Sequence, residues 1–435
     1  MRLKLLNNIK SVRGMHDFLP KTTTIWQKIE YKIKKVLNSY GYNEIKFPII
    51  ENNKLFKRAI GNITDIVEKE MYSFYDKNGN YLTLRPEGTA SCVRASIENG
   101  ILYNQEQRLW YFGPMFRYER PQKGRYRQFN QIGIEIFGLP ESNIEIELLM
   151  ITLRWWKILN ISKYMKLEIN YIGSIKERKQ YKKDLIIFLE KYKNKLDLEC
   201  KNRLYKNPLR ILDTKNIKII KILKKAPNLK YYLNKKSISY FNNLLYLLKF
   251  FKINYIVNKN LFRGLDYYNN TVFEWKTNFF KNKSITICAG GRYDNLVKKI
   301  GGFDVPAIGC AMGFERLLML FLKCKKKKKN IIDYINIYII VHNFNKQNIF
   351  IKFAEILRDL LPKIKVFLDF NYKKKIKKKI IKAKKMKSLF ILIENKNKIK
   401  TNKLIMKNLI NGNKLIKTKK QIIKILLKKL LNNIH

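Results

Sequence analysis

The sequence predicts an α+β protein with an antiparallel-sheet core, a mainly helical insertion and a C-terminal α/β domain. Residues 108–138 contain two strand-like segments joined by a charged loop. A long middle stretch, residues 166–260, carries Leu, Ile and Tyr at helical spacing, with Pro208 and Pro227 as breaks. A lysine run at residues 325–329 then precedes alternating strand and helix patterns, which indicates a further domain.

Length, composition and charge limit the functions that need to be considered. The chain has 435 residues, enough for two or three domains, and 46% of them are hydrophobic, as in a folded protein. Its 91 Lys and Arg exceed its 33 Asp and Glu, and the formal charge of +58 would attract nucleic acid. A drift of the whole composition toward Lys, Asn and Ile explains any single lysine equally well, so both explanations of the charge stay open.

Cysteine and histidine are too scattered to form a set of ligands. The five cysteines include no CxxC pair, which argues against a zinc site or a disulfide framework and favours a reducing compartment. The three histidines, His16, His342 and His435, lie far apart, and we assign none of them a catalytic role. Because no apolar run has the length of a signal peptide or a membrane span, we expect a soluble, cytoplasmic protein with no membrane partner.

Two segments of the first 165 residues predict a polar site. Residues 81–100 read as a strand, a Pro-Glu-Gly turn and a helix that Thr89 caps and Gly100 ends. In the second strand of 108–138, Gln131, Gly133 and Glu135 point to the face opposite three isoleucines. Gln131 and Glu135 are about 13 Å apart at roughly 3.3 Å per residue, with the glycine leaving room for a ligand. A solvent-facing strand edge explains the Gln and Glu, but not the glycine.

The last stretch, residues 330–435, predicts a small α/β domain. The expected order is strand, helix, strand, lysine-rich helix and strand at residues 334–341, 346–361, 365–368, 373–387 and 389–393. A hairpin signalled by Asn411-Gly412 and a last helix complete it.

Four stretches resemble a known family in type, order and spacing. FRYERPQKGRYRQF is similar to motif 2 of class II aminoacyl-tRNA synthetases in its histidyl form, and LFRGLDYYNNTVFEWKTN to the segment that sets histidyl enzymes apart. GYNEIKFPIIE resembles motif 1 and VPAIGCAMGFERLLMLFLK resembles motif 3. The resemblance to histidyl-tRNA synthetases implies a class II catalytic core in residues 1–165 and 261–325, a helical insertion in 166–260 and an anticodon-binding domain in 330–435.

The same resemblance implies an activity and its partners. A histidine-tRNA ligase activates L-histidine with ATP to histidyl-adenylate and transfers it to the 3′ end of tRNA(His). ATP is then a substrate, and Mg²⁺ is inferred from ATP rather than from any spacing of ligands. Motif 1 with Pro48 implies a homodimer. The C-terminal domain departs from the family, because lysine and isoleucine replace mixed residues and ILIEN lacks an expected glycine.

The resemblance also implies roles for the residues that bind histidine. Glu87 and Thr89, with Gln131, receive the α-ammonium group, which needs an acceptor such as a carboxylate. Glu135 and Tyr268 bracket the imidazole, because a ring with two nitrogens needs a partner at each end. Tyr293 closes the amino-acid pocket. For the neighbouring Tyr267, a place in the hydrophobic core is an adequate explanation.

Three arginines are implied to do the catalytic work. Arg117 grips the α-phosphate, Arg316 holds the γ-phosphate, and Arg263 lies over the α-phosphate and the histidine carboxylate. Gly290 and Gly291 let the backbone approach the adenylate. The motif 2 loop meets the acceptor end of the tRNA through Lys123, Arg125 and Arg127, although a solvated basic turn is an adequate explanation for any one of these three.

Two other classes of function compete with the ligase. A synthetase-like regulatory subunit would bind histidine without aminoacylating tRNA, but the presence of Arg263, Arg316 and a C-terminal domain argues against it. A nonspecific nucleic-acid binder that keeps the fold is supported by the charge of +58 alone.

Overall fold

The structure is a computed structural model that describes residues 9–61, 64–214, 216–280, 283–324, 336–341, 343–362, 364–394 and 403–431. It divides into two compact units, Met1–Lys328 and Lys329–His435, which are treated separately below. The lysine run at 325–329 that predicted a domain boundary lies outside the described residues, as do His342 and His435.

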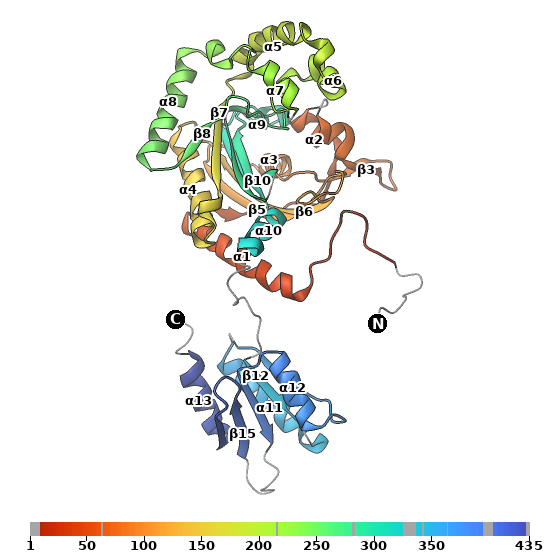
Figure 1. Cartoon of the computed structure of the whole chain (residues 1–435), viewed down its shortest axis with the longest axis vertical. Coiled ribbons are helices and arrows are strands. Elements are labelled where there is room, and N and C mark those ends of the chain that lie inside the picture. The colour runs from red at the N-terminus through yellow and green to blue at the C-terminus, as the bar shows by residue number, and fades with distance from the viewer. Residues whose placement is uncertain are drawn as a thin grey trace. The chain divides into compact units, whose positions relative to one another are not determined.

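The centre of the first unit is an eight-stranded sheet with strand order β1-β5-β6-β11-β10-β9-β7-β8 (Figure 1). Antiparallel pairing joins the six strands from β5 to β7, and each edge strand runs parallel to its neighbour. The strands are β1 (Asn43–Glu44), β5 (Gln107–Phe116), β6 (Gln128–Phe137), β7 (Lys166–Tyr171), β8 (Tyr255–Val257), β9 (Asn269–Phe280), β10 (Lys283–Arg292) and β11 (Ala307–Gly313).

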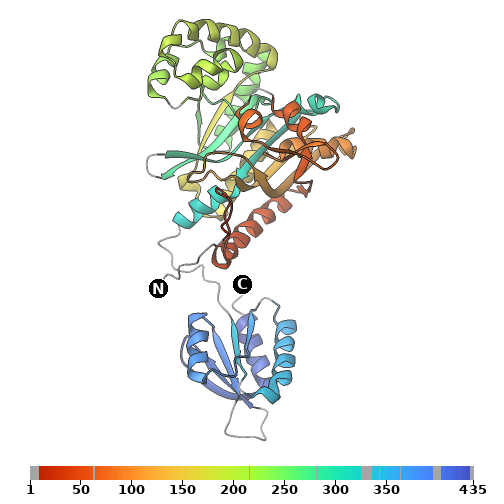
Figure 2. The same cartoon turned by 90° about the vertical axis from the view of Figure 1, so that its right-hand side faces the viewer.

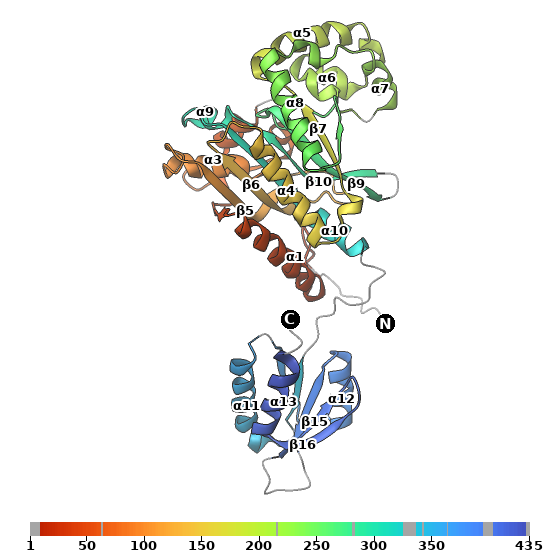
Figure 3. The ribbon, with the colours of Figure 1, turned by 90° about the vertical axis from the view of Figure 1, so that its left-hand side faces the viewer.

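Helices α1 (Pro20–Ser39), α4 (Asn143–Ile158) and α10 (Phe314–Cys324) cover one face of this sheet (Figure 3). Aromatic rings make the contact: the Trp26 ring centroid lies 4.4 Å from that of Phe314 and 6.1 Å from that of Phe112. On α4, Thr152 Oγ1 accepts a hydrogen bond of 2.9 Å from Trp275 Nε1 on β9. Because these helices bury one face, the opposite face is left for a ligand.

The opposite face carries a smaller layer. Helices α2 (Asn53–Ile60), α3 (Thr89–Glu98) and α9 (Leu296–Ile300) pack on one another there. A three-stranded sheet, with order β2-β4-β3, lies beside them and consists of β2 (Ile50–Asn52), β3 (Tyr72–Tyr75) and β4 (Tyr81–Leu84). Its last strand, β4, leads directly into the turn before α3.

The helical segment at one end of the first unit consists of α5 (Ile175–Glu190), α6 (Leu198–Lys206), α7 (Ile217–Leu223) and α8 (Lys235–Phe250) (Figure 2). Each helix follows a residue whose side-chain oxygen accepts from a backbone N–H of its first turn: Ser174, Asp197, Asn216 and Asn234. The boundary predicted at residue 166 needs correction, since Lys166–Tyr171 is β7 of the core sheet. The period-2 burial of Leu167 and Ile169 marks it as a strand.

The second unit holds a five-stranded sheet with order β13-β12-β14-β15-β16. Its parallel strands are β12 (Ile337–Ile340), β13 (Val366–Asp369) and β14 (Phe390–Glu394), and β15 (Lys403–Asn408) and β16 (Lys414–Thr418) form the hairpin predicted at Asn411-Gly412. Helices α11 (Gln347–Leu360) and α13 (Lys419–Leu431) pack on one face and α12 (Ile376–Lys385) on the other. The predicted succession of strands and helices is confirmed.

Candidate active site

A pocket opens on the free face of the large sheet, where segments distant in sequence meet. The turn before α3, strands β6, β10 and β11, the β5–β6 loop and the segment 263–268 all contribute to its walls. Eight of the residues predicted for the site line it: Glu87, Thr89, Arg117, Arg125, Gln131, Arg263, Tyr268 and Arg316. The structure therefore brings together residues from all the motif-like stretches except motif 1.

Glu87 holds the turn at the start of α3. Its two carboxylate oxygens accept hydrogen bonds of 2.8 Å each from the backbone N–H groups of Thr89 and Ala90. The prediction that Thr89 caps this helix is therefore wrong, because its hydroxyl donates to Glu135 Oε1 at 2.7 Å instead. Burial raises the pKa of the Glu87 carboxyl, and the two backbone donors oppose that rise.

Glu135 lies beneath the pocket rather than in its wall. Its side chain is fully buried and accepts from the hydroxyls of Thr89, of Tyr111 at 3.3 Å and of Tyr293. Burial raises the pKa of Glu135 to about 8, although these hydroxyl donors favour the ionised form. The carboxyl therefore holds a proton near neutral pH. Tyr293 is also buried and does not line the pocket, and its ring centroid lies 5.7 Å from that of Tyr267, a residue of the pocket wall.

The room predicted above Gly133 is filled by the protein itself. A Cβ atom at Gly133 would lie 2.1 Å from Tyr111 Cζ, and one at Gly88 would lie 2.2 Å from Tyr111 Cε2. Both glycines thus admit the Tyr111 ring, which packs between the α3 turn and β6. The sequence showed that space was needed at Gly133, but not that a tyrosine of the neighbouring strand would take it.

Arg117 and Arg316 are oriented by backbone carbonyls. Arg117 Nε donates to Pro86 O at 2.8 Å, and its guanidinium lies 5.4 Å from the centroid of the Phe129 ring. Arg316 Nε and Nη1 donate to Gly124 O at 2.7 Å and Thr286 O at 3.0 Å. Burial lowers the pKa of Arg316. Each guanidinium keeps further N–H groups for an anion in the pocket.

Arg263 is held by an acidic residue that the sequence interpretation missed. Its Nη1 donates to Glu274 on β9, which also accepts from Thr286 Oγ1 at 3.0 Å and pairs with Lys276 at 3.1 Å. Burial favours a higher pKa for Glu274, but Arg263 and Lys276 outweigh it and lower the value. Among the described residues, the buried Arg263 Nε has no hydrogen-bond acceptor. This unpaired donor, like the equally unpaired Gln131 Oε1, points to a polar ligand.

Two further pocket residues were not predicted. Tyr267 belongs to the hydrophobic core, as the sequence allowed, but it also lines the pocket and donates to Glu87 Oε2 at 3.4 Å. Glu315 accepts from the backbone N–H of Asn130 at 2.8 and 2.9 Å and from its Nδ2 at 2.9 Å, which ties the start of α10 to β6. The position of Glu315 directly before Arg316 was the available signal.

Other predicted residues do not line the pocket. A Cβ at Gly290 would lie 2.1 Å from Gly309 O, and one at Gly291 would lie 2.4 Å from Thr271 O, so these glycines serve close strand packing. In the β5–β6 loop, Lys123 lies 5.2 Å from the Phe280 ring centroid and Arg127 lies 3.7 Å from that of Tyr118. The third loop residue, Arg125, does line the pocket and pairs with Glu119 at 3.5 Å.

The described part of the chain holds no group of three or more His, Cys, Asp or Glu side chains placed to bind a metal ion. Within the same described ranges, no helix is long and apolar enough to cross a membrane.

A family model described as histidyl-tRNA synthetase matches residues 14–317, which include every residue of the pocket. The chain belongs to the histidyl-tRNA synthetase family. A histidine–tRNA ligase of Buchnera aphidicola subsp. Schizaphis graminum (strain Sg) is 52% identical over 423 residues, covering 95% of this chain and 96% of that protein. The histidine–tRNA ligase activity inferred from the sequence is thereby confirmed.

Solved structures agree with this membership. An apo histidyl-tRNA synthetase of S. aureus is 31% identical with a TM-score of 0.80, covering 96% of this chain and 99% of the other. The α+β fold class is thus confirmed. A structure described as an ATP phosphoribosyltransferase regulatory subunit/histidyl-tRNA synthetase from Bacillus halodurans C is 19% identical with a TM-score of 0.63, covering 89% of this chain and 98% of the other, which shows the fold alone. The regulatory alternative is not favoured.

Proposed function

We propose that this histidyl-tRNA synthetase forms histidyl-adenylate in the pocket around Arg117, Arg263 and Arg316. The observation that carries the proposal is the convergence of these arginines, from three separate segments, with Glu87 and Gln131 in one pocket. Fixed guanidiniums stabilise the charge that develops when a carboxylate attacks a phosphate. The acceptor oxygens of Glu87 and Gln131 suit an α-ammonium group.

In the proposed activation step, the protein positions the two substrates and stabilises the charge that develops on the phosphate. A carboxylate oxygen of histidine bonds to the α-phosphorus of ATP while the bond to the bridging oxygen breaks and pyrophosphate leaves. Arg117 and Arg263 hold the α-phosphate, and Arg316 holds the γ-phosphate. The ion pair with Glu274 fixes Arg263 before the substrates bind, so little reorganisation is needed. A hydroxyl of the terminal ribose of tRNA(His) then attacks the histidyl carbonyl, and AMP leaves.

The proposed imidazole site combines Tyr268, in the pocket wall, with Glu135 beneath it. Because Glu135 is buried and holds a proton, its contact with the imidazole is expected to pass through Thr89, whose hydroxyl it binds. Histidine selection would then depend on the hydroxyl network of Thr89, Tyr111 and Tyr293 as a unit.

Magnesium would reach this site with the nucleotide. Mg²⁺ usually keeps several waters and uses one or two carboxylates plus substrate phosphates, so the lack of a three-ligand cluster among the described side chains is compatible with it. Glu119 and Glu315 are carboxylates of the pocket wall that fit this pattern. When bound, the ion would neutralise phosphate charge.

The remaining proposals concern tRNA, assembly and location. The basic loop residues Lys123, Arg125 and Arg127 contact the acceptor end, and the second unit binds the anticodon, with its lysine-rich α12 supplying backbone affinity. A homodimer forms through the region of Pro48, where Ile49 is 41% exposed and further exposed side chains are Ile50, Phe74, Tyr75 and Tyr81. The protein acts in the cytoplasm.

Pyrophosphate exchange into ATP tests the proposal. The purified protein should catalyse exchange only when L-histidine is present, and transfer of labelled histidine to tRNA(His) should follow. A folded protein that binds histidine but supports no exchange would instead have the properties of a regulatory subunit.

A further inference from the structure

A second cavity lies behind the segment that carries Arg263. It is formed by α5 and by the 3-10 turn Pro208–Ile211 on the helical side, and by residues 262–268 on the core side. We call it the Arg178 cavity. Arg263, Leu265 and Tyr268 line both this cavity and the catalytic pocket. This segment therefore borders both spaces.

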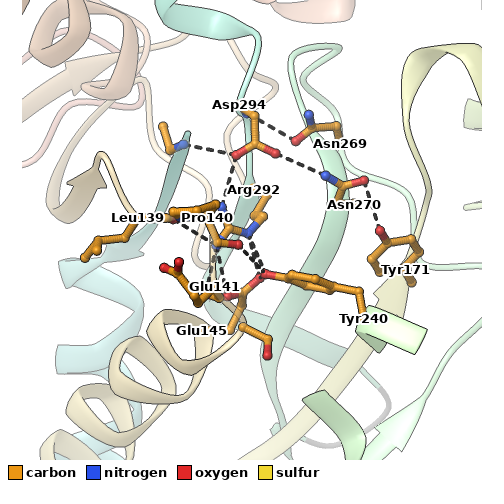
Figure 4. A network of polar contacts seen from close by, with 12 residues as sticks. Leu139, Pro140, Glu141, Glu145, Tyr171, Tyr240, Asn269, Asn270, Arg292 and Asp294 are labelled. Atoms are coloured by element: carbon orange, nitrogen blue, oxygen red, sulfur yellow. Dashed lines mark hydrogen bonds and ion pairs between the residues drawn. The ribbon is translucent and has the colours of Figure 1, made fainter. Parts of the chain in front are cut away.

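Arg178 on α5 is only 9% exposed, yet its side chain makes no hydrogen bond or ion pair with the described residues. Burying a charged group without partners is costly. Figure 4 shows how the same protein satisfies a comparable guanidinium: Arg292, 2% exposed, donates to Glu145, Asp294 and the carbonyl oxygens of Leu139 and Glu141. The Arg178 side chain has no such carboxylate or carbonyl acceptor among the described residues.

The surroundings of Arg178 add positive charge. Lys182 and Arg210 also line the cavity, and the ion-pair partners of Arg210 among the described residues are Asp65 at 3.8 Å and Asp213 at 3.9 Å. Asp266 is the only carboxylate among the cavity-lining residues, and it accepts from Asn207 Nδ2 at 3.1 Å without forming an ion pair among the described residues. Burial lowers the pKa of Arg178 to about 10, and the carboxylates of Asp266 and Glu177 offset this shift only in part.

We propose that the Arg178 cavity is a second anion site that binds a phosphate group. Guanidinium and ammonium groups from α5 and the 3-10 turn match a phosphate, which accepts several charge-assisted hydrogen bonds. Because the catalytic pocket adjoins the cavity, we favour a backbone phosphate of the single-stranded acceptor end of tRNA as the bound group. A free phosphate anion would make the same contacts and is the alternative ligand. The choice of tRNA rests on the proposed ligase function.

The full-length Arg178→Met variant tests the site, with Lys179→Met as a matched control. Lys179 is the exposed neighbour on the same helix, so both variants lose one positive charge. For Arg178→Met, we expect the KM for tRNA to rise about tenfold and the slope of its dependence on log salt to fall by about 0.7. Histidine-dependent pyrophosphate exchange, which needs no tRNA, should remain at the wild-type level for both variants.

A second measurement distinguishes the sources of phosphate. Inorganic phosphate should raise the thermal midpoint of the wild type and of Lys179→Met, but not that of Arg178→Met. If this shift is lost while the KM for tRNA is unchanged, the site takes a free anion. If the shift and the KM are both unchanged, or if Lys179→Met behaves like Arg178→Met, the proposal is overturned.

Two controls keep the test independent of folding and of the ligase function. Lys182→Met, at an exposed position of the same cavity, carries the same expectations should Arg178→Met fail to fold. A wild type without pyrophosphate exchange would contradict the proposed function, whereas the phosphate-dependent shift would still test the cavity.

Discussion

Replacing Glu135 by Gln should flatten the pH dependence of stability of the first unit. The folded protein retains the Glu135 proton up to about pH 8, whereas the unfolded chain loses it near the ordinary value of 4.5. Because the folded state binds more protons between these two values, stability falls as pH rises through this window. Glutamine carries no titratable proton, so the variant loses this contribution.

The size of the effect follows from the one extra proton that the folded state binds between the unfolded pKa of 4.5 and the folded pKa of about 8. Each pH unit lowers the free energy of unfolding by about 1.4 kcal/mol, and the whole window amounts to something on the order of 5 kcal/mol. Solvent screening is small, since the Glu135 side chain is fully buried. A buried carboxyl outside this hydrogen-bond network, such as Glu145, contributes equally to both proteins and cancels in the difference between them.

Urea denaturation followed by tryptophan fluorescence at pH 5, 6, 7 and 8 measures this difference. All five tryptophans, the last being Trp275, lie in the first unit, so the signal reports on that unit alone. The Glu68→Gln variant, at an exposed position, should keep the wild-type slope. Parallel profiles for Glu135→Gln and the wild type would refute the buried, protonated state of Glu135.

Three further predictions address the reaction, the packing and the charge. Arg263→Gln should keep histidine binding measurable by calorimetry while pyrophosphate exchange falls by about 10²–10³-fold, and an unimpaired variant would remove Arg263 from the mechanism. Gly133→Ala should destabilise the protein by about 1–3 kcal/mol in denaturation experiments, because its Cβ would overlap the Tyr111 ring; an unchanged midpoint would show that the ring can move. The affinity for tRNA, measured by filter binding, should fall steeply between 50 and 200 mM salt, as is typical of phosphate contacts, and insensitivity to salt would contradict the electrostatic account of the basic surface.

The sequence predicted best what depends on local periodicity. The alternation around Gln131 and Glu135 correctly assigned a polar and an apolar face to β6, and the C-terminal elements followed from their apolar spacing and turn residues. Period-2 and period-3.6 patterns fix which side of an element is buried. They were less useful for β7, where the short strand Lys166–Tyr171 stands directly before a long helical segment.

The sequence could not predict which distant side chain fills a given space. Tyr111 occupies the room next to Gly133, and Glu274 supplies the partner of Arg263, through strand register and tertiary packing. The unpaired Arg178 is a further example, because a lysine-rich chain offers many cations and only burial distinguishes this one. The total charge of +58 therefore says less about recognition than one guanidinium in a cavity.

The position of β11 bears on how the chain is synthesised. This strand, Ala307–Gly313, is the last of its sheet in sequence but lies in the middle, between β6 and β10. Until β11 has left the ribosome, the β6 edge of the N-terminal strands and the β10 edge of the later β7–β10 group have no partner strand. Such unpaired edges are open to association with other nascent chains. Strong mutual repulsion between such positively charged chains would keep these edges apart until β11 closes the sheet.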